Sequence, residues 1–123
     1  MWLFTVWGFY SIAVFRDGRS KLAAVRARRR SHLEQLSKAF AAAFRNRPIL
    51  YGAANDYPYR VTMPFSVWLK LLDGMAAEQD WSNFKDAAAV RLGRFDDYTD
   101  ELHHVWQQMK VLESPVDDAT EVI

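Results

Sequence analysis

The amino-terminal run from Trp2 to Phe15 most constrains how this chain can fold, because it is almost entirely apolar. A helix that crosses a membrane needs about 20 apolar residues, and this run already ends at Arg16. No basic stretch precedes it and no small-residue cleavage site follows it, so a secretory signal is not expected. The run is rich in aromatic and β-branched residues and carries Gly8 in its middle, which predicts two strands, 2–6 and 9–15.

The next segment, 21–28, predicts a third strand that follows a turn at Asp17-Gly18. In it apolar and basic residues alternate, so that one face is apolar and the other carries Arg26 and Arg28. Two further strands are expected over 49–53 and 57–63. In the last one the residues at odd positions from Tyr57 should share one face and Arg60 and Thr62 the other.

Four helices are expected. Ser31 and Glu34 have the spacing of a capping box, which predicts a helix from this point to Pro48. A second helix should be capped by Ser66, and a short third one should begin at Asp80 or Ser82. After Gly93 the chain has its clearest helical periodicity, with an apolar stripe of Phe95, Tyr98, Leu102, Val105, Trp106, Met109 and Leu112.

The order β-β-β-α-β-β-α-α-α predicts an α+β fold, with an antiparallel-rich sheet of four to five strands and helices packed on one face. Its ββαββα part is the ferredoxin-like order with the last strand moved to the front. A chain of 123 residues, half of them hydrophobic, is expected to form one domain over 1–112, followed by an acidic flexible tail over 113–123. The absence of cysteine excludes disulfides and fits a cytoplasmic protein.

The net charge of +1 conceals a division between the two halves of the chain. Residues 1–60 contain 11 basic and 3 acidic side chains, whereas residues 61–123 contain 5 basic and 12 acidic ones. Either the two halves neutralise each other within the fold, or they present opposite charges to partners. The first of these interpretations is favoured.

A basic sheet face is the first candidate site. If 21–28 and 57–63 are neighbouring central strands, Arg26, Arg28 and Arg60 share the face away from the helices, and Phe9 and Phe15 extend it. Arginines beside aromatic rings on an open sheet face are typical of RNA-binding domains. A solvated face, or one covered by the acidic half of the chain, is the favoured alternative.

The paired histidines His103 and His104 lie close to carboxylates in sequence, which suggests a metal site. No third strong ligand is specified, so a solvated polar face is the better interpretation and no cofactor is expected. His32 follows a helix start, yet no nucleophile accompanies it. No G-x-S-x-G, Walker A or H-E-x-x-H motif is present, and an enzyme is therefore not expected.

Taken in order, five segments resemble a family of small bacterial and phage-associated proteins without an assigned activity: "MWLFTVWGFYS", "VRARRRSHLEQL", "DYPYR", "DWSNFKDA" and "HHVW". The resemblance covers residues 1 to about 110. Trp81 stands where a tyrosine is common, and the paired histidines depart from the family pattern. The resemblance implies a whole-chain domain in a bacterial or phage cytoplasm and assigns no functional residue.

The sequence therefore predicts a small non-enzymatic binding protein that docks on a macromolecule, with a protein as the expected partner and no membrane contact. In a phage setting it would be an inhibitor of a host defence complex whose acidic helices imitate nucleic acid. The alternative is a nucleic-acid-binding module that uses the basic sheet face. The partner-binding candidates are Arg26, Arg28, Arg60, Phe9, Phe15, Asp96, Asp97 and Asp100.

Overall fold

A computed structural model of the chain describes residues 1–113. It contains one five-stranded antiparallel sheet and five α-helices, which confirms the α+β fold class with helices at the carboxyl-terminal end. Residues 114–123, nearly all of the predicted acidic tail, lie outside the described part of the chain. The strands are β1 (Trp2–Phe4), β2 (Phe9–Asp17), β3 (Ser20–Ala27), β4 (Leu50–Tyr51) and β5 (Tyr59–Pro64).

The strands follow the spatial order β1-β2-β3-β5-β4, and every neighbouring pair is antiparallel. The part β2-β3-β5-β4 is the order that a ferredoxin-like sheet has after its last strand moves to the front of the chain. β1 forms one edge of the sheet, pairs antiparallel with β2 and is joined to it by the short loop 5–8. The β2–β3 hairpin closes through a two-residue turn, in which Gly18 supplies a φ of 61°.

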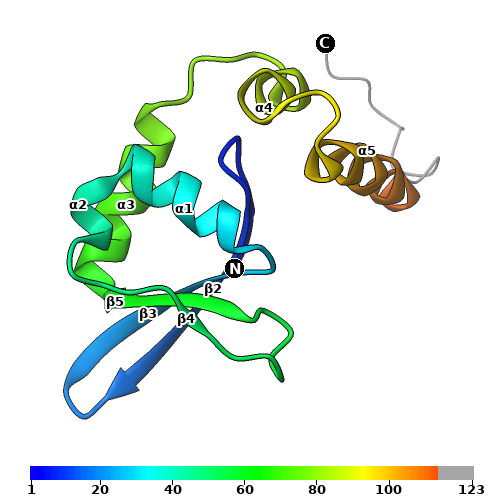
Figure 1. Ribbon diagram of the computed structural model, residues 1–123. Coiled ribbons are helices and arrows are strands. Elements are labelled where there is room, and N and C mark those ends of the chain that lie inside the picture. Colours follow the sequence, from blue (N-terminus) through cyan, green and yellow to red (C-terminus); the bar gives the residue numbers. More distant parts are fainter. Residues whose placement is uncertain (114–123) are drawn as a thin grey trace.

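One face of the sheet carries the core. Tyr10, Val25, Val61 and their neighbours on this face are almost completely buried. Three helices cover it: α1 (Arg30–Ala39), α2 (Ala41–Phe44) and α3 (Phe65–Ala77). Figure 1 shows all three on the same side of the sheet, and no helix of residues 1–113 covers the central strands β3 and β5 from the opposite side. The helices thus cover the sheet face for which the strand alternation predicts apolar residues.

The first helix differs from its prediction at both ends. It begins at Arg30, with the extended residue Arg29 at its N-cap and no side-chain cap, so the predicted capping box at Ser31 is wrong. Glu34 instead pairs with Arg30 at 2.9 Å. The predicted single helix to Pro48 is broken at Phe40, whose φ of −133° turns its ring onto Trp7, with ring centroids 5.1 Å apart.

The starts of the next two helices also differ from the sequence prediction. The N-cap of α3 is Pro64, and Ser66 lies within the helix. The following helix, α4 (Phe84–Leu92), begins later than predicted, because the side chain of Asn83 caps it and accepts from the backbone N–H of Asp86 at 3.0 Å. In both cases a residue near the predicted cap provides the observed N-cap.

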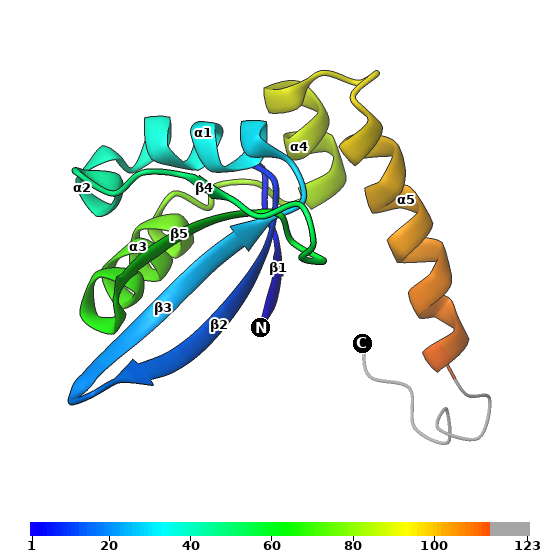
Figure 2. The ribbon, with the colours of Figure 1, turned by 60° about the horizontal axis from the view of Figure 1, so that its bottom comes forward.

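The last helix, α5 (Asp97–Met109), packs through its first half only and continues into a short 3₁₀ turn, η1 (Lys110–Leu112). Tyr98 and Leu102 are buried, whereas Trp106 and Met109 are about half exposed or more, and Phe95 before the helix is 89% exposed. Figure 2 shows α4 and α5 to one side of the α1–α3 layer. Within residues 1–113, no helix has the length and apolarity needed to span a membrane.

Candidate functional site

The strand register brings the predicted basic residues together on the uncovered face of the sheet, here called the open face. Arg26 of β3 lies directly opposite Arg60 of β5 on one side and Ser11 of β2 on the other. Residues opposite each other share a face, and the same register puts Phe15 beside Leu22. The open face comprises Trp2, Phe4, Phe9, Ser11, Ala13, Phe15, Leu22, Ala24, Arg26, Arg28, Leu50, Arg60 and Thr62.

An aromatic cluster occupies the end of the open face near β1. The rings of Phe4 and Phe9 stack with centroids 4.5 Å apart, and Trp2 meets Phe9 edge to face at 5.9 Å. Tyr57 joins Phe9 at 6.2 Å. The prediction that Tyr57 begins a strand and faces away from Arg60 is wrong, because β5 begins only at Tyr59 and the preceding turn frees Tyr57 to swing onto this face.

Two arginines complete this cluster. The guanidinium carbons of Arg26 and Arg28 lie 5.0 and 5.1 Å from the Tyr57 ring centroid, within the range of a cation–π contact. Arg26 also donates to the Ser11 side-chain oxygen at 2.8 Å, which fixes its position across the strands. Arg28 is exposed, and Arg60 is half-buried. None of these three arginines has a carboxylate partner within residues 1–113.

Large apolar side chains remain exposed on the open face. Trp2 is 66% exposed, Leu50 53% and Phe15 44%. The strands contain a single acidic residue, Asp17 at the hairpin tip. The open face is therefore both apolar and basic, and the helices described here leave most of it uncovered.

The acidic half of the chain meets the basic half at one arginine. Arg29 lies 3.1 Å from Asp97 and 3.8 Å from Asp96. Asp96 is also the N-cap of α5 and accepts from the backbone N–H of Tyr98 at 2.8 Å. Of the three predicted acidic candidates, only Asp100 has no ion pair in the described structure. Within residues 1–113, ion pairs between the two halves are therefore limited to the contact between the start of α5 and the start of α1.

The paired histidines do not converge on one point. His104 lies 3.4 Å from Glu101, while His103 stacks on Trp106 with centroids 5.6 Å apart and faces Lys85 at 3.5 Å. Within residues 1–113 no three metal-ligating side chains gather at a single site. An ammonium group beside His103 also disfavours a cation there.

A second group of buried polar residues lies where the β1–β2 loop meets α1. The Thr5 hydroxyl donates to the Gly8 carbonyl at 2.7 Å and accepts from the backbone N–H groups of Trp7 and Gly8. Gly8 has a φ of 152°, and a Cβ built on it would lie 2.4 Å from Cγ of His32. The loop thus brings the bare backbone of Gly8 against the imidazole.

The imidazole of His32 is oriented by its other neighbours. Its Nδ1 accepts from the backbone N–H of Phe9 at 3.2 Å, so the neutral ring carries its proton on Nε2. Tyr98 packs edge-on against the ring at 4.9 Å, and its hydroxyl donates to the Thr5 carbonyl at 2.7 Å. His32 is only 7% exposed. The loop, α1 and α5 therefore meet around one fixed histidine.

Beside this histidine lies a cavity of about 250 Å³, here called the His32 hollow. Its apolar walls come from Phe4 and Phe9 of the open face and from Leu102 of α5. Its charged and polar lining comprises Arg28, Arg29, His32, Asp97, Tyr98 and Glu101. The hollow is thus continuous with the open face and ends at α5.

Burial lowers the pKa of the His32 imidazole from its usual value, and the nearby Arg29 lowers it further, while Asp96 acts in the opposite direction. Asp97 and Glu101 line the same hollow. Burial also raises the pKa of the Tyr98 hydroxyl, which keeps it in the protonated form that donates to Thr5. His32 is therefore a neutral hydrogen-bonding group at neutral pH.

The stability of the protein is expected to fall as the pH is lowered through about 6.5, where an unfolded histidine takes up a proton and the native His32 does not. The loss ends below the lowered native pKa and follows a slope of at most about 1.4 kcal/mol per pH unit. Urea unfolding between pH 7 and 5 measures this dependence of the free energy of unfolding on pH. His32→Asn should flatten the slope, and the exposed control His103→Asn should not. Equal slopes in the wild type and both variants would contradict the assignment of the pH dependence to His32.

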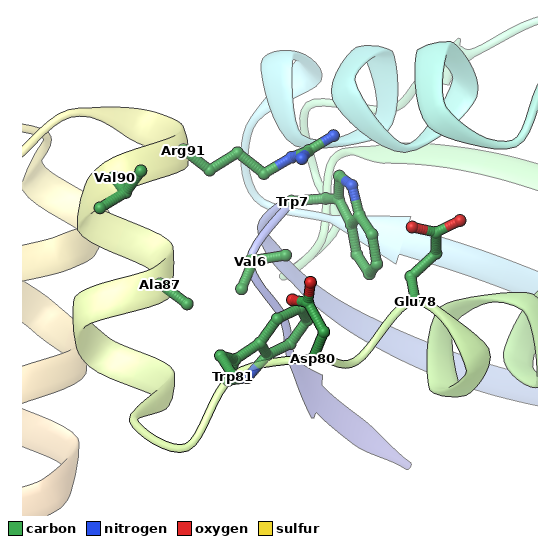
Figure 3. Close-up of a pocket in the computed structure, with 8 residues that line it drawn as sticks. All are labelled: Val6, Trp7, Glu78, Asp80, Trp81, Ala87, Val90 and Arg91. Carbon is green, nitrogen blue, oxygen red and sulfur yellow. The ribbon is translucent and has the colours of Figure 1, made fainter.

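A second cavity, of about 430 Å³, lies between the β1–β2 loop and α4. Figure 3 shows Arg91 reaching toward Trp7, whose ring centroid lies 5.4 Å from the guanidinium carbon, with Glu78 and Asp80 on other sides. The indole nitrogen of Trp7 has no partner among residues 1–113, but it is sealed from solvent. A ligand in this cavity could not reach it.

Sequence reasoning identified the arginines of the open face but missed Tyr57, Trp2 and the His32 hollow. Trp2 lies two residues before Phe4, and alternate residues of a strand share a face. Its pairing with Ser11 puts it on the open face, so the strand alternation could have identified it. His32 carries no such signal, because its contact with Gly8 joins residues 24 positions apart through the conformation of the loop.

Comparisons of the chain with protein-family models, with curated proteins and with solved structures find no match. The resemblance to small bacterial and phage-associated proteins therefore stays a prediction.

Proposed function

We propose that the protein is a non-enzymatic binding protein whose open face docks on a partner protein with an apolar and acidic surface. The observation that carries this proposal is the combination, on one uncovered sheet face, of exposed Trp2, Phe15 and Leu50 with arginines that have no carboxylate partner among residues 1–113. Aromatic and arginine side chains contribute most to the stability of protein interfaces.

The rings of the open face favour a protein over a single-stranded nucleic acid. Base stacking needs free ring faces, yet Phe4 and Phe9 stack on each other and Tyr57 is flanked by two guanidinium groups. Only Trp2 and Phe15, toward opposite ends of the face, are strongly exposed aromatic rings there. The arginines supply phosphate contacts, so nucleic acid is the second candidate, with binding that weakens steeply as salt is raised.

The more specific hypothesis of a phage-type inhibitor relies on acidic helices that imitate nucleic acid. Two of its three acidic candidates, Asp96 and Asp97, are engaged by Arg29. The open face offers a larger surface for a partner than these carboxylates do. The inhibitor role stays a prediction that this fold does not strengthen.

A variant that combines Trp2→Ala, Phe15→Ala and Arg60→Ala should capture the partner of the wild-type protein at least tenfold more weakly, because the changes remove two exposed rings and a half-buried guanidinium from the open face. The measurement is a quantitative pulldown at moderate salt. These residues lie outside the His32 hollow, so the result is independent of that site.

The matched control removes the same kinds of side chain elsewhere on the surface, with Val90→Ala, Phe95→Ala and Arg94→Ala. Val90 and Phe95 are 88% and 89% exposed. This control should capture the partner as the wild type does. Equal capture by all three proteins, or equal loss in both variants, would overturn the proposal.

A further inference from the structure

We infer that the His32 hollow is a binding site for a small monocarboxylic acid with an apolar body, held by the Arg28 guanidinium and the Nε2–H of His32. Nothing in the proposed docking function requires this site. It follows from three observations: an unpartnered buried donor, an unpaired cation and an apolar wall of suitable size.

The donor is the far nitrogen of His32. Because Nδ1 accepts from the Phe9 backbone, Nε2 carries the proton and points away from that contact. It makes no hydrogen bond within residues 1–113. In that part of the chain the side-chain nitrogen that is both sealed from solvent and without a partner is Trp7 Nε1, so the unpartnered Nε2 of His32 keeps some access to solvent. The side chain is more than nine-tenths buried and lines the hollow, so a ligand oxygen is its natural acceptor.

The cation is Arg28. Its neighbour Arg29 is occupied by Asp96 and Asp97, but Arg28 has no carboxylate partner in the described structure. Its guanidinium lies on the Tyr57 ring, which restricts its movement while leaving its N–H groups available. A planar guanidinium binds a carboxylate through two parallel hydrogen bonds.

The other residues that line the hollow determine the size and the polarity of the ligand's body. Phe4, Phe9 and Leu102 form an apolar wall. The cavity of about 250 Å³ has room for about eight water volumes of roughly 30 Å³ each, which suits an acid with a single ring. Asp97 and Glu101 also line the hollow and balance the charges of Arg28 and Arg29. Each negative charge of a ligand is repelled by these two carboxylates, so a phosphate dianion is disfavoured more strongly than a monocarboxylate.

Phenylacetate is a suitable probe for this site. Titration followed by calorimetry and by the ¹⁵N signals of His32 should give saturable binding with a dissociation constant of about 1 mM or tighter, an ordinary efficiency for about ten non-hydrogen atoms. The uncharged isostere phenylacetamide and the dianion phenyl phosphate should each bind at least tenfold more weakly.

Two variants test the donors separately. Arg28→Gln, at an exposed residue, should weaken phenylacetate binding at least tenfold. His32→Asn keeps an acceptor for the Phe9 N–H but removes the Nε2 donor, and should weaken binding similarly; its folding is checked by thermal unfolding. Arg60→Gln, on the open face but outside the hollow, is the control and should bind as the wild type does.

Absence of saturable binding by the wild type up to about ten times the expected constant would overturn the inference. So would equal affinities of the wild type and Arg28→Gln, even if His32→Asn failed to fold. Equal binding of phenylacetamide and phenylacetate would also overturn it, because an apolar cavity without carboxylate recognition would remain. The docking proposal is unaffected by any of these results.

Discussion

Replacement of Gly8 by alanine is expected to lower the free energy of unfolding by roughly 2–6 kcal/mol. The backbone there has a φ of 152°, which side-chain-bearing residues rarely adopt, and the new Cβ would lie 2.4 Å from Cγ of His32. Neither the loop nor the ring can move freely, because the Thr5 hydroxyl holds the loop and Phe9 and Tyr98 hold the imidazole. Urea denaturation measures the change.

Gly18→Ala is the matched control for this prediction. Gly18 also has a positive φ, of 61°, but no atom lies within 4 Å of a Cβ placed there. Gly18→Ala should lower the free energy of unfolding by only about 1–2 kcal/mol, the cost of a left-handed backbone at a residue with a side chain. Adding His32→Ala to Gly8→Ala should recover only part of the loss, because it removes Cγ and Nδ1 of residue 32 but leaves its Cβ 2.6 Å from the new methyl group. Equal losses at the two glycines would contradict the close contact between Gly8 and His32.

Trp68→Ala is expected to lower the free energy of unfolding by about 3–5 kcal/mol, because it opens a large cavity in the core. Trp68 is 3% exposed and lies on α3, which covers the central strands β3 and β5. The same substitution at Trp106, which is 48% exposed and contacts Lys85 and Lys110, should cost at most about 1 kcal/mol.

The comparison of these two tryptophans tests the position of α5. Trp106 belongs to the helical apolar stripe in the sequence, so a helix packed along its whole length would make the two losses similar. In the structure only Tyr98 and Leu102 of that stripe are buried. Equal losses in urea denaturation would show that the second half of α5 is part of the core.

Local patterns predicted the layers of the fold well. Alternation in the third strand placed Val25 in the core and Arg26 on the opposite face, because a period of two residues leaves no other choice once one face is buried. The order of strands and helices predicted that the third and fifth strands are central neighbours and that Arg26 and Arg60 share a face, but the register that puts these two arginines directly opposite each other was not predicted.

Features that depend on distant contacts were beyond the reach of such patterns. Ser31 has the spacing of a cap, but the N-cap is Arg29, two residues earlier, and His32 packs in the first turn against Gly8. Phe40 breaks its helix to pack on Trp7, and Tyr57 leaves the strand to join Phe9. Each of these contacts joins residues far apart in sequence, and the same is true of the His32 hollow.

Hydroxyl-radical footprinting of the captured complex is the most direct test that the open face is the binding surface. In the free protein, Trp2 and Phe15 should be oxidised readily, and partner binding should slow this several-fold while Phe95 and Trp106 stay reactive. Protection of Phe95 and Trp106 with unchanged oxidation of Trp2 and Phe15 would contradict the proposed function and assign binding to α5.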